Sequence, residues 1–462
     1  MRKSTAVMKF TRKAVAARSS LRWLAALAIL AVATAFAAPA NAMTIQTVKS
    51  PGGITAWLVE AHEVPLIAMR FAFIGGASQD PAGKEGLAHF LSGMLDEGAG
   101  DLKSVAFQER MEEAAVRMSF DASRDVFMGS FQTLTKNSEQ GFELLRMALN
   151  EARFDADAVE RIRGQILTGL KFDMNDPQRV ATREWYKLAF AGHPYGRPVK
   201  GNKTTVAAIQ AEDLRNYTSR VFARDSLRIA VVGDIDAETL GRVLDQVFST
   251  LPESGTLTAV PEATPPSGPQ RKVVEMKIPQ SVAQFGHSAF KRDDKDFIGS
   301  YVINYILGGG GFASRLTEEV REKRGLAYSV YSYVHPYQHG AIYSGSVATK
   351  SDAIGQSLEV IKGELERMAV DGPTQEELKD AKQYLTGSYA LRFDTSMKIA
   401  SQLLWIQIQE LGIDYVEKRN ALIEAVTLDD VKRVAKRLLK ADGLIVTIVG
   451  EPEAVAEEPA PG

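Results

Sequence analysis

The sequence contains no cysteine among its 462 residues. This absence excludes disulfide bonds, a cysteine nucleophile and any metal site built from thiolate ligands. A hydrophobic content of 45% in a chain of this length allows large buried cores without such cross-links. The length itself predicts two to three domains.

Acidic residues are absent from the first 42 positions, which carry seven lysines and arginines. An apolar run from Trp23 to Ala38 follows, and Ala40-Asn41-Ala42 then supplies small residues typical of a cleavage site. This order predicts a secretory signal peptide over residues 1–42, with an uncleaved membrane anchor as the alternative. We therefore expect a periplasmic protein that has no membrane attachment after cleavage.

Excess charge of one sign is also absent from the whole chain, whose formal net charge is −2. Removing the seven leader cations takes that charge to −9. A mildly acidic protein is a poor partner for nucleic acid, so we expect no nucleic-acid binding.

Four regions follow the leader. Residues 251–272 are rich in Pro, Ser, Thr and Gly and predict a linker. The linker separates a first half, residues 43–250, from a second half, residues 273–450. The acidic, proline-containing residues 451–462 predict a disordered tail.

The two halves end in similar sequences, at residues 211–234 and 428–451. Asp213 aligns with Asp430, and Gly233 aligns with Gly450 without a gap. Each stretch reads as an amphipathic helix, a short turn and a buried strand. A second nearly in-register match, Leu-Thr-Gly at residues 167–169 and 385–387, indicates an internal duplication.

Each half is predicted to be a mixed α+β unit with helices on a sheet. Alternating apolar residues predict strands at Ala68–Ile74, Phe127–Phe131, Val273–Met276 and Ala341–Val347. Helical spacing predicts helices at Asn137–Ala152, Asp155–Phe172, Ala353–Ala369 and Gln375–Tyr389.

The segment GLAHFLSGML, residues 86–95, follows a predicted strand and a glycine-containing turn. As a helix it places His89 and Gly93 on one face, with Ser92 beside them. The inverted zinc motif H-x-x-E-H has this spacing, with two histidine ligands and a glutamate base. Here the glutamate position holds Ser92 and the second histidine position holds Gly93.

Several motifs together resemble the pitrilysin/insulinase family of zinc peptidases in its bacterial form with two homologous halves. They are GGASQDPAGKEGLAHFLSGML, HPYGRPVKG at residues 193–201 and FASRLTEEVREKRGLAYSVYS at residues 312–332. The resemblance extends over about residues 44–450. It implies two α+β halves like those of the mitochondrial processing peptidase, which close as a clamshell on dimerisation.

In active family members two glutamates, one of them the third metal ligand, lie on a later helix. Aligned on Asp176-Pro177, these positions are Ile162 and Gly169 here. The resemblance thus implies that His89 alone remains of three ligands, whereas a catalytic zinc needs three protein ligands and an open position. We expect no metal on this chain and assign zinc to a partner. A half-buried, hydrogen-bonded structural role for His89 and a relocated metal site using His62 or His193 are the alternatives.

Family members use an arginine and a tyrosine, seven residues apart, to contact the substrate and the transition state. The matching residues are Arg321 and Tyr328. A guanidinium can donate to a peptide carbonyl, and a tyrosine hydroxyl can stabilise an oxyanion. Alternatively, Arg321 is a surface charge on an ion-paired helix and Tyr328 begins a strand.

These features predict a non-catalytic, substrate-binding or regulatory subunit of a periplasmic heteromeric zinc peptidase. Its partner is a homologous chain with an intact H-x-x-E-H motif, to which it contributes Arg321 and Tyr328. Its ligands are extended peptides that pair with a strand edge. The alternatives are a stand-alone peptide-binding or assembly protein without proteolysis and an independent peptidase with a relocated metal.

Overall fold

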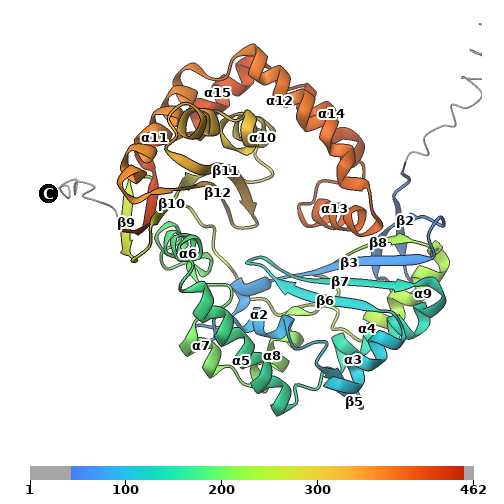
Figure 1. Cartoon of the computed structure of the whole chain (residues 1–462). Helices are drawn as coiled ribbons and strands as arrows, with labels where there is room; N and C mark the ends of the chain where they lie inside the picture. Colours follow the sequence, from blue (N-terminus) through green and yellow to red (C-terminus); the bar gives the residue numbers. More distant parts are fainter. Residues whose placement is uncertain (1–42, 452–462) are drawn as a thin grey trace, which may run out of the picture. The chain divides into compact units, whose positions relative to one another are not determined.

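Two β-sheets organise residues 43–451, the part of the chain that this computed structural model describes (Figure 1). The predicted signal peptide lies outside the described residues. So does the predicted disordered tail, apart from its first residue, Glu451.

The first sheet has six strands in the order β1-β2-β8-β3-β7-β6. Neighbouring strands are antiparallel except β2 and β8, which run parallel. The strands are β1 (Gln46–Lys49), β2 (Thr55–Glu60), β3 (Leu66–Ile74), β6 (Arg117–Ala122), β7 (Val126–Leu134) and β8 (Leu227–Gly233). The short strands β4 (Gly98–Ala99) and β5 (Leu102–Lys103) pair separately.

The second sheet has five strands in the order β11-β12-β10-β13-β9. Its neighbours are antiparallel except β13 and β9, which run parallel. The strands are β9 (Gln270–Glu275), β10 (Gln280–Ser288), β11 (Ala327–Tyr337), β12 (Gly340–Lys350) and β13 (Ile445–Gly450).

The two sheets have the same topology. The single parallel pair lies at the same end of each sheet when two strand orders are compared. These orders are β2-β8-β3-β7-β6 and β9-β13-β10-β12-β11. The matched helices before β8 and β13 also begin alike, since Asp213 and Asp430 each complete a capping box. The predicted α+β class with two homologous halves is confirmed.

Helices connect and cover the strands. Those before residue 251 are α2 (Leu87–Ser92), α3 (Ser104–Glu113), α4 (Ser138–Asn150), α5 (Ala156–Asp173), α6 (Pro177–Ala189), α7 (Lys203–Ala208), α8 (Ala211–Val221) and α9 (Ala237–Phe248). The later ones are α10 (Phe297–Asn304), α11 (Ile354–Asp371), α12 (Gln375–Gly387), α13 (Ser396–Ile408), α14 (Tyr415–Glu424) and α15 (Leu428–Leu438). Within residues 43–451, no helix combines the length and apolar character needed to cross a membrane.

Each strand and helix predicted from the pattern falls on an observed element of the same type. Strand β9 begins at Gln270, three residues before the predicted start, and so overlaps the predicted linker. Gln270, Arg271 and Lys272 are exposed, so this part of the strand carries no apolar signal. The domain boundaries themselves remain a prediction.

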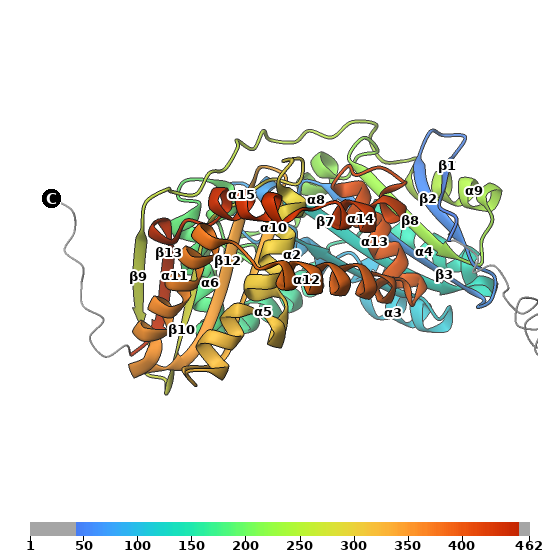
Figure 2. The same ribbon diagram turned by 90° about the horizontal axis from the view of Figure 1, so that it is seen from above.

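The helices α6 and α13 each pack on the sheet of the other half (Figure 1, Figure 2). Helix α6 lies against β10 and β13, and the buried Trp185 donates its indole N–H to Ile445 O at 2.8 Å. Helix α13 lies against β3 and β8, where the Gln407 amide donates to Ile229 O at 2.9 Å. The two halves therefore exchange equivalent helices, which the sequence pattern did not predict.

Candidate functional site

Helix α2, which carries His89, is held in place at its N-terminus by a buried carboxylate. Asp80 accepts hydrogen bonds from the backbone N–H groups of Gly86, Leu87 and Ala88 at 2.9, 3.1 and 3.0 Å. Gly86 has φ +96°, and a Cβ atom there would lie 2.7 Å from Lys200 O. The scaffold of the zinc motif is therefore kept, and it is joined to the 193–201 motif.

His89 is half-buried, as the structural alternative predicted. Burial, and then the positive charge of Lys200, lowers the pKa of His89, whereas Asp121 and Asp173 act in the opposite direction. Within residues 43–451 its imidazole has no hydrogen-bond partner, so the predicted hydrogen bond is absent. A lowered pKa favours the neutral imidazole, which is the form that binds metals.

Ser92 is the residue at the position predicted for the catalytic glutamate of the motif. Its side chain is nearly buried, and its hydroxyl donates to His89 O at 2.8 Å within the helix. A serine hydroxyl with this bond offers no basic group to a metal-bound water. The general base of the motif therefore has no replacement at this position.

The positions predicted for the two missing ligands lie at the C-terminal end of α2 and on α5, and these helices contact each other. Helix α2 ends at Gly93, where a Cβ atom would lie 3.3 Å from Ile162 Cγ2. A Cβ atom at Gly169 would meet nothing within 4 Å. An isoleucine thus fills the space beside Gly93, and open space lies beside Gly169.

The histidines considered for a relocated metal site have other partners. His62 Nδ1 lies 2.7 Å from Asp234 Oδ1. His193 Nε2 lies 2.9 Å from Pro261 O, while its Nδ1 accepts the Tyr195 N–H at 3.0 Å. No group of three or more potential ligand side chains with metal-binding geometry occurs in residues 43–451.

Strand β6 forms one edge of the first sheet and packs against α2. Its side chains at Arg117, Ser119 and Asp121 are exposed. Asp121 also acts electrostatically on His89, which places this edge beside the remnant of the zinc motif. An edge strand presents unpaired backbone groups to which an extended peptide can add.

Arg321 and Tyr328 are brought together in the second half, with Phe312 beside them. The Arg321 guanidinium carbon lies 5.3 Å from the centre of the Tyr328 ring and 4.8 Å from that of Phe312. Tyr328 is 79% exposed and Phe312 is 74% exposed. Glu322 Oε1, 3.3 Å from Arg321 Nε, completes the group. Two large aromatic side chains and a guanidinium are therefore presented together to solvent.

A β-bulge places Tyr328 in this position. The pairing of β11 with β12 shifts register between Ala327 and Ser329, and β11 is the edge strand of the second sheet. Bulges re-aim a side chain at a sheet edge and are common beside active sites. Arg321 belongs to a π-helical turn, Thr317–Glu322, a geometry that is also frequent at functional sites.

The sequence interpretation overlooked the charged groups around His89. Lys200 and Asp173, which form an ion pair at 3.0 Å, both act on the imidazole. Lys200 belongs to the motif HPYGRPVKG, which supported the resemblance but had no role assigned. Gly86, which precedes α2, contacts the backbone of Lys200. This glycine was the feature of the sequence that could have indicated a close approach of another segment to the helix.

Comparisons with known proteins identify the family. Residues 60–203 match the model for insulinase (peptidase family M16), and residues 208–385 match that for the peptidase M16 inactive domain. A non-peptidase homologue, YmxG, of Helicobacter pylori is 29% identical over 338 residues, covering 73% of this chain and 78% of that one. An uncharacterized zinc protease of Streptomyces coelicolor is 26% identical over 415 residues, covering 86% and 87%.

A solved structure supports the same assignment. The peptidase M16 inactive domain of Pseudomonas fluorescens superposes with a TM-score of 0.83 at 28% identity, covering 90% of this chain and all of that one. A protease of Helicobacter pylori, at 18% identity and a TM-score of 0.80, shows the same fold. The two family models together cover more than half of the chain. The chain belongs to the M16 (insulinase) family.

Proposed function

We propose that this chain is the substrate-binding subunit of a periplasmic heteromeric zinc peptidase and supplies Arg321 and Tyr328 to a partner's zinc site. The observation that carries the proposal is the contrast between the two halves. The first half has lost the base at Ser92 and the ligand at Gly93, whereas the second half keeps Arg321 and Tyr328 side by side.

The exposure of Tyr328 favours a role at a surface that another molecule covers. An apolar ring gains free energy when it is removed from water, and exposed aromatic and arginine side chains are enriched at binding hot spots. The intramolecular partners of this group are the neighbouring Phe312 and Glu322. Its hydroxyl and guanidinium donors therefore remain available to a peptide carbonyl on a partner chain.

The edge strand β6 supports a peptide as the ligand. It lies beside α2, the helix that carries His89. An extended peptide can add to this edge through main-chain hydrogen bonds, which makes binding tolerant of sequence. That the H. pylori relative is described as a non-peptidase homologue is consistent with a binding role.

The experiment uses a homologous chain with an intact H-x-x-E-H motif, purified with and without this chain. We expect a stable complex that cleaves an unfolded peptide faster than either chain alone. Tyr328→Phe or Arg321→Ala should lower kcat/KM of the complex about a hundredfold, the effect of removing one oxyanion donor. Tyr384→Phe and Arg242→Ala, also on exposed side chains, serve as controls and should leave it unchanged.

Two outcomes would overturn the proposal. Unchanged turnover in both the Arg321 and Tyr328 variants would show that these residues do not contribute to the partner's zinc site. Failure to form any complex, with peptide binding retained, would instead favour a stand-alone peptide-binding protein.

A further inference from the structure

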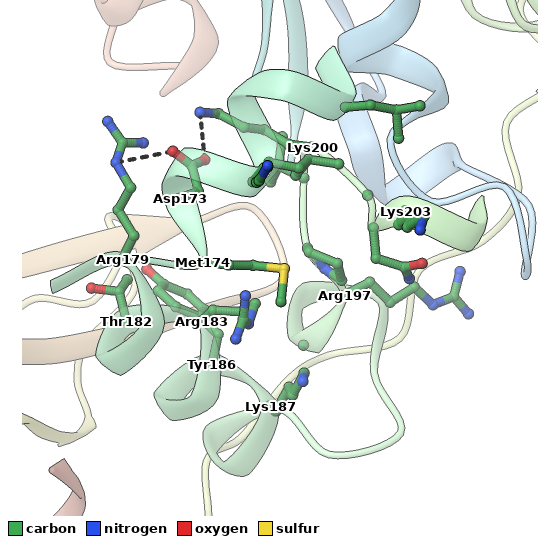
Figure 3. Close-up of a pocket in the computed structure, with 18 of the residues that line it drawn as sticks. Asp173, Met174, Arg179, Thr182, Arg183, Tyr186, Lys187, Arg197, Lys200 and Lys203 are labelled. Carbon is green, nitrogen blue, oxygen red and sulfur yellow. Dashed lines mark hydrogen bonds and ion pairs between the residues drawn. The ribbon is translucent and has the colours of Figure 1, made fainter. Parts of the chain in front are cut away.

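A cavity of about 1050 Å³ is lined by residues of α5, α6 and the HPYGRPVKG motif. Figure 3 shows ten of its lining residues with labels. The walls of the cavity are the C-terminal part of α5, one face of α6, residues 196–203 and Arg124. Leu170 of the wall follows Gly169 directly, and Lys200 of the wall acts on His89. The cavity therefore adjoins the site where the proposed function places a peptide.

The lining is strongly basic on the side of α6. Arg179, Arg183 and Lys187 line it from this helix, and Arg124 and Lys171 line it nearby. Arg124 lies over another lining residue, the ring of Tyr186, at 3.7 Å from its centre.

The opposite side is basic as well. Arg197, Lys200 and Lys203 come from the segment that follows the HPYG turn (Figure 3). The single acidic lining residue is Asp173, which pairs with Lys200 at 3.0 Å and with Arg179 at 3.2 Å. Eight of the twenty lining residues are thus cationic, in a chain whose acidic residues outnumber its basic ones.

Carboxylates of the protein neutralise only part of this charge. Behind the wall, Glu184 contacts Arg183, Lys187 and Lys272 at 2.7 to 3.0 Å. Burial alone would raise the pKa of Glu184, but hydrogen bonds from these three cations lower it to about 2. Glu184 is therefore ionised, yet one negative charge faces three positive ones.

Four lining cations have no carboxylate partner within residues 43–451. They are Arg124, Lys171, Arg197 and Lys203. Like charges confined to one cavity repel each other, and that repulsion is relieved when an anion enters. The arrangement is complementary to a ligand with several negative charges.

Part of the lining is apolar. Leu167, Leu170, Met174 and Val199 belong to it, and Met174 is 60% exposed. A ligand that fits the cavity must therefore offer apolar groups together with its negative charges. A peptide with alternating acidic and aliphatic side chains has this character.

Nucleic acid fits the cavity less well. Single strands bind along grooves with aromatic rings on which successive bases stack. The one aromatic ring of this lining, Tyr186, is already covered by Arg124. The volume is that of a ligand pocket rather than of an extended phosphate track.

We propose that this cavity binds acidic peptide segments, whose carboxylates pair with its arginines and lysines while aliphatic side chains pack against Leu167 and Leu170 of its lining. The inference rests on the proposed peptide-binding function and adds the substrate class. Guanidinium groups bind carboxylates with paired, parallel hydrogen bonds, so arginine-rich walls favour such ligands.

The test measures fluorescence anisotropy of labelled peptides with the purified chain, without a partner. A peptide of alternating Glu and Leu should bind, and its affinity should fall as salt is raised. The same peptide with Gln in place of Glu should bind at least about tenfold more weakly, because each lost charge removes about 1 kcal/mol of attraction. Equal binding of the two peptides would overturn the inference.

Charge variants locate the site. Lys171→Glu/Lys203→Glu should weaken binding of the acidic peptide by at least about tenfold. The neutralising pair Lys171→Gln/Lys203→Gln should cause a smaller loss in the same direction. Lys136→Glu/Lys277→Glu changes two exposed lysines outside the cavity and is the control. If the control pair weakens binding equally, the cavity is not the site.

Competitors distinguish the sources of negative charge. A single-stranded oligonucleotide or inorganic pyrophosphate that displaces the peptide at lower concentration than unlabelled acidic peptide would assign the cavity to phosphate ligands. The chain itself carries acidic residues after Glu451. A variant that ends at Glu451 should bind the peptide like the full chain; binding by the shorter variant alone would assign the cavity to that segment.

These results separate the inference from the proposed function. If the Gln and Glu peptides bind equally while the complex with the partner still depends on Arg321 and Tyr328, only the inference fails. If the acidic peptide binds the cavity but no active complex forms, only the shared-site function fails.

Discussion

At the scale of single residues, the predicted loss of the zinc site involves a few positions on a helical scaffold that is kept. Asp80 still caps α2, and His89 still lies on it half-buried. Gly93 and Gly169 have lost their side chains altogether, while Ile162 occupies the space next to Gly93. A scaffold this intact allows the ligand set to be rebuilt.

Restoring the ligands should restore metal binding. The variant Gly93→His/Ile162→Ala/Gly169→Glu, together with His89, presents two imidazoles and a carboxylate. We expect about one zinc per chain by elemental analysis, because three such ligands with a water form a stable tetrahedral site.

A matched control places the glutamate elsewhere on α5. A Cβ atom at Gly164 meets nothing within 4 Å, as at Gly169, so Gly164→Glu is equally tolerated. In the same background it should leave the zinc content low. Equal zinc in the two variants would mean that Gly169 is not the third ligand position.

A buried histidine in the second half makes stability depend on pH. His287 is 2% exposed, stacks on Tyr343 and lies 2.7 Å from Ser288 O through Nδ1. Burial lowers the pKa of His287 from 6.5 to about 4. Between these values the unfolded chain binds more protons than the folded chain, so stability is present above pH 6.5 and falls as the pH is lowered to 4.

The expected loss of unfolding free energy is about 3 kcal/mol, because each pH interval of one between the two pKa values contributes about 1.4 kcal/mol. Urea unfolding at several pH values measures it. His287→Phe should flatten the pH dependence although it lowers stability at neutral pH, whereas His339→Gln, at a partly exposed ring, should keep the wild-type slope. A wild-type slope in His287→Phe would contradict the assignment.

At the scale of elements, the exchange of α6 and α13 ties the two halves together. Trp185 of α6 is fully buried against the second sheet, and Trp405 of α13 is 48% exposed. The two residues occupy similar helices but have opposite surroundings, which makes them a matched pair.

Trp185→Ala should lower the free energy of unfolding by about 3–5 kcal/mol, because it removes a large buried side chain and its bond to Ile445 O. Trp405→Ala should cost less than about 1 kcal/mol, as expected for a half-exposed side chain. Chemical denaturation followed by circular dichroism measures both. Equal losses would show that α6 does not hold the halves together.

Periodicity was sufficient to predict the elements but not their partners. The alternation in residues 68–74 predicted β3, and the capping residues at Asp213 and Asp430 marked the duplicated helices. Nothing local distinguishes a helix that covers its own sheet from one that covers the other. The face of α6 around Trp185 is apolar in either case, so only the fold decides where it is buried.

The candidate site, too, could be predicted from the sequence only in part. The spacing of the inverted zinc motif identified His89, and the family resemblance identified Arg321 and Tyr328, because each lies in a motif that is contiguous in sequence. Their roles stay predictions. The basic cavity was not predicted because its lysines and arginines come from separate segments of the sequence. Each of these residues by itself resembles an ordinary surface charge. Only folding gathers Lys171 and Lys203 into one lining.

At the scale of the whole molecule, the two halves contain sheets of one topology, and we propose different roles for them. The first sheet presents the edge strand β6 beside the remnant of the zinc motif, and the second presents Tyr328 at the edge strand β11. In the proposed complex the first edge holds the peptide and the second completes the zinc site of the partner. In that complex the metal and the catalytic base belong to the partner chain, whereas Arg321 and Tyr328 belong to this chain.

Zinc content and peptide hydrolysis, measured together on this chain alone and on its complex with an H-x-x-E-H homologue, test that division most directly. The account predicts no stoichiometric zinc and no chelator-sensitive hydrolysis for the isolated chain, and about one zinc with chelator-sensitive hydrolysis for the complex. Stoichiometric zinc together with chelator-sensitive hydrolysis in the isolated chain would contradict it.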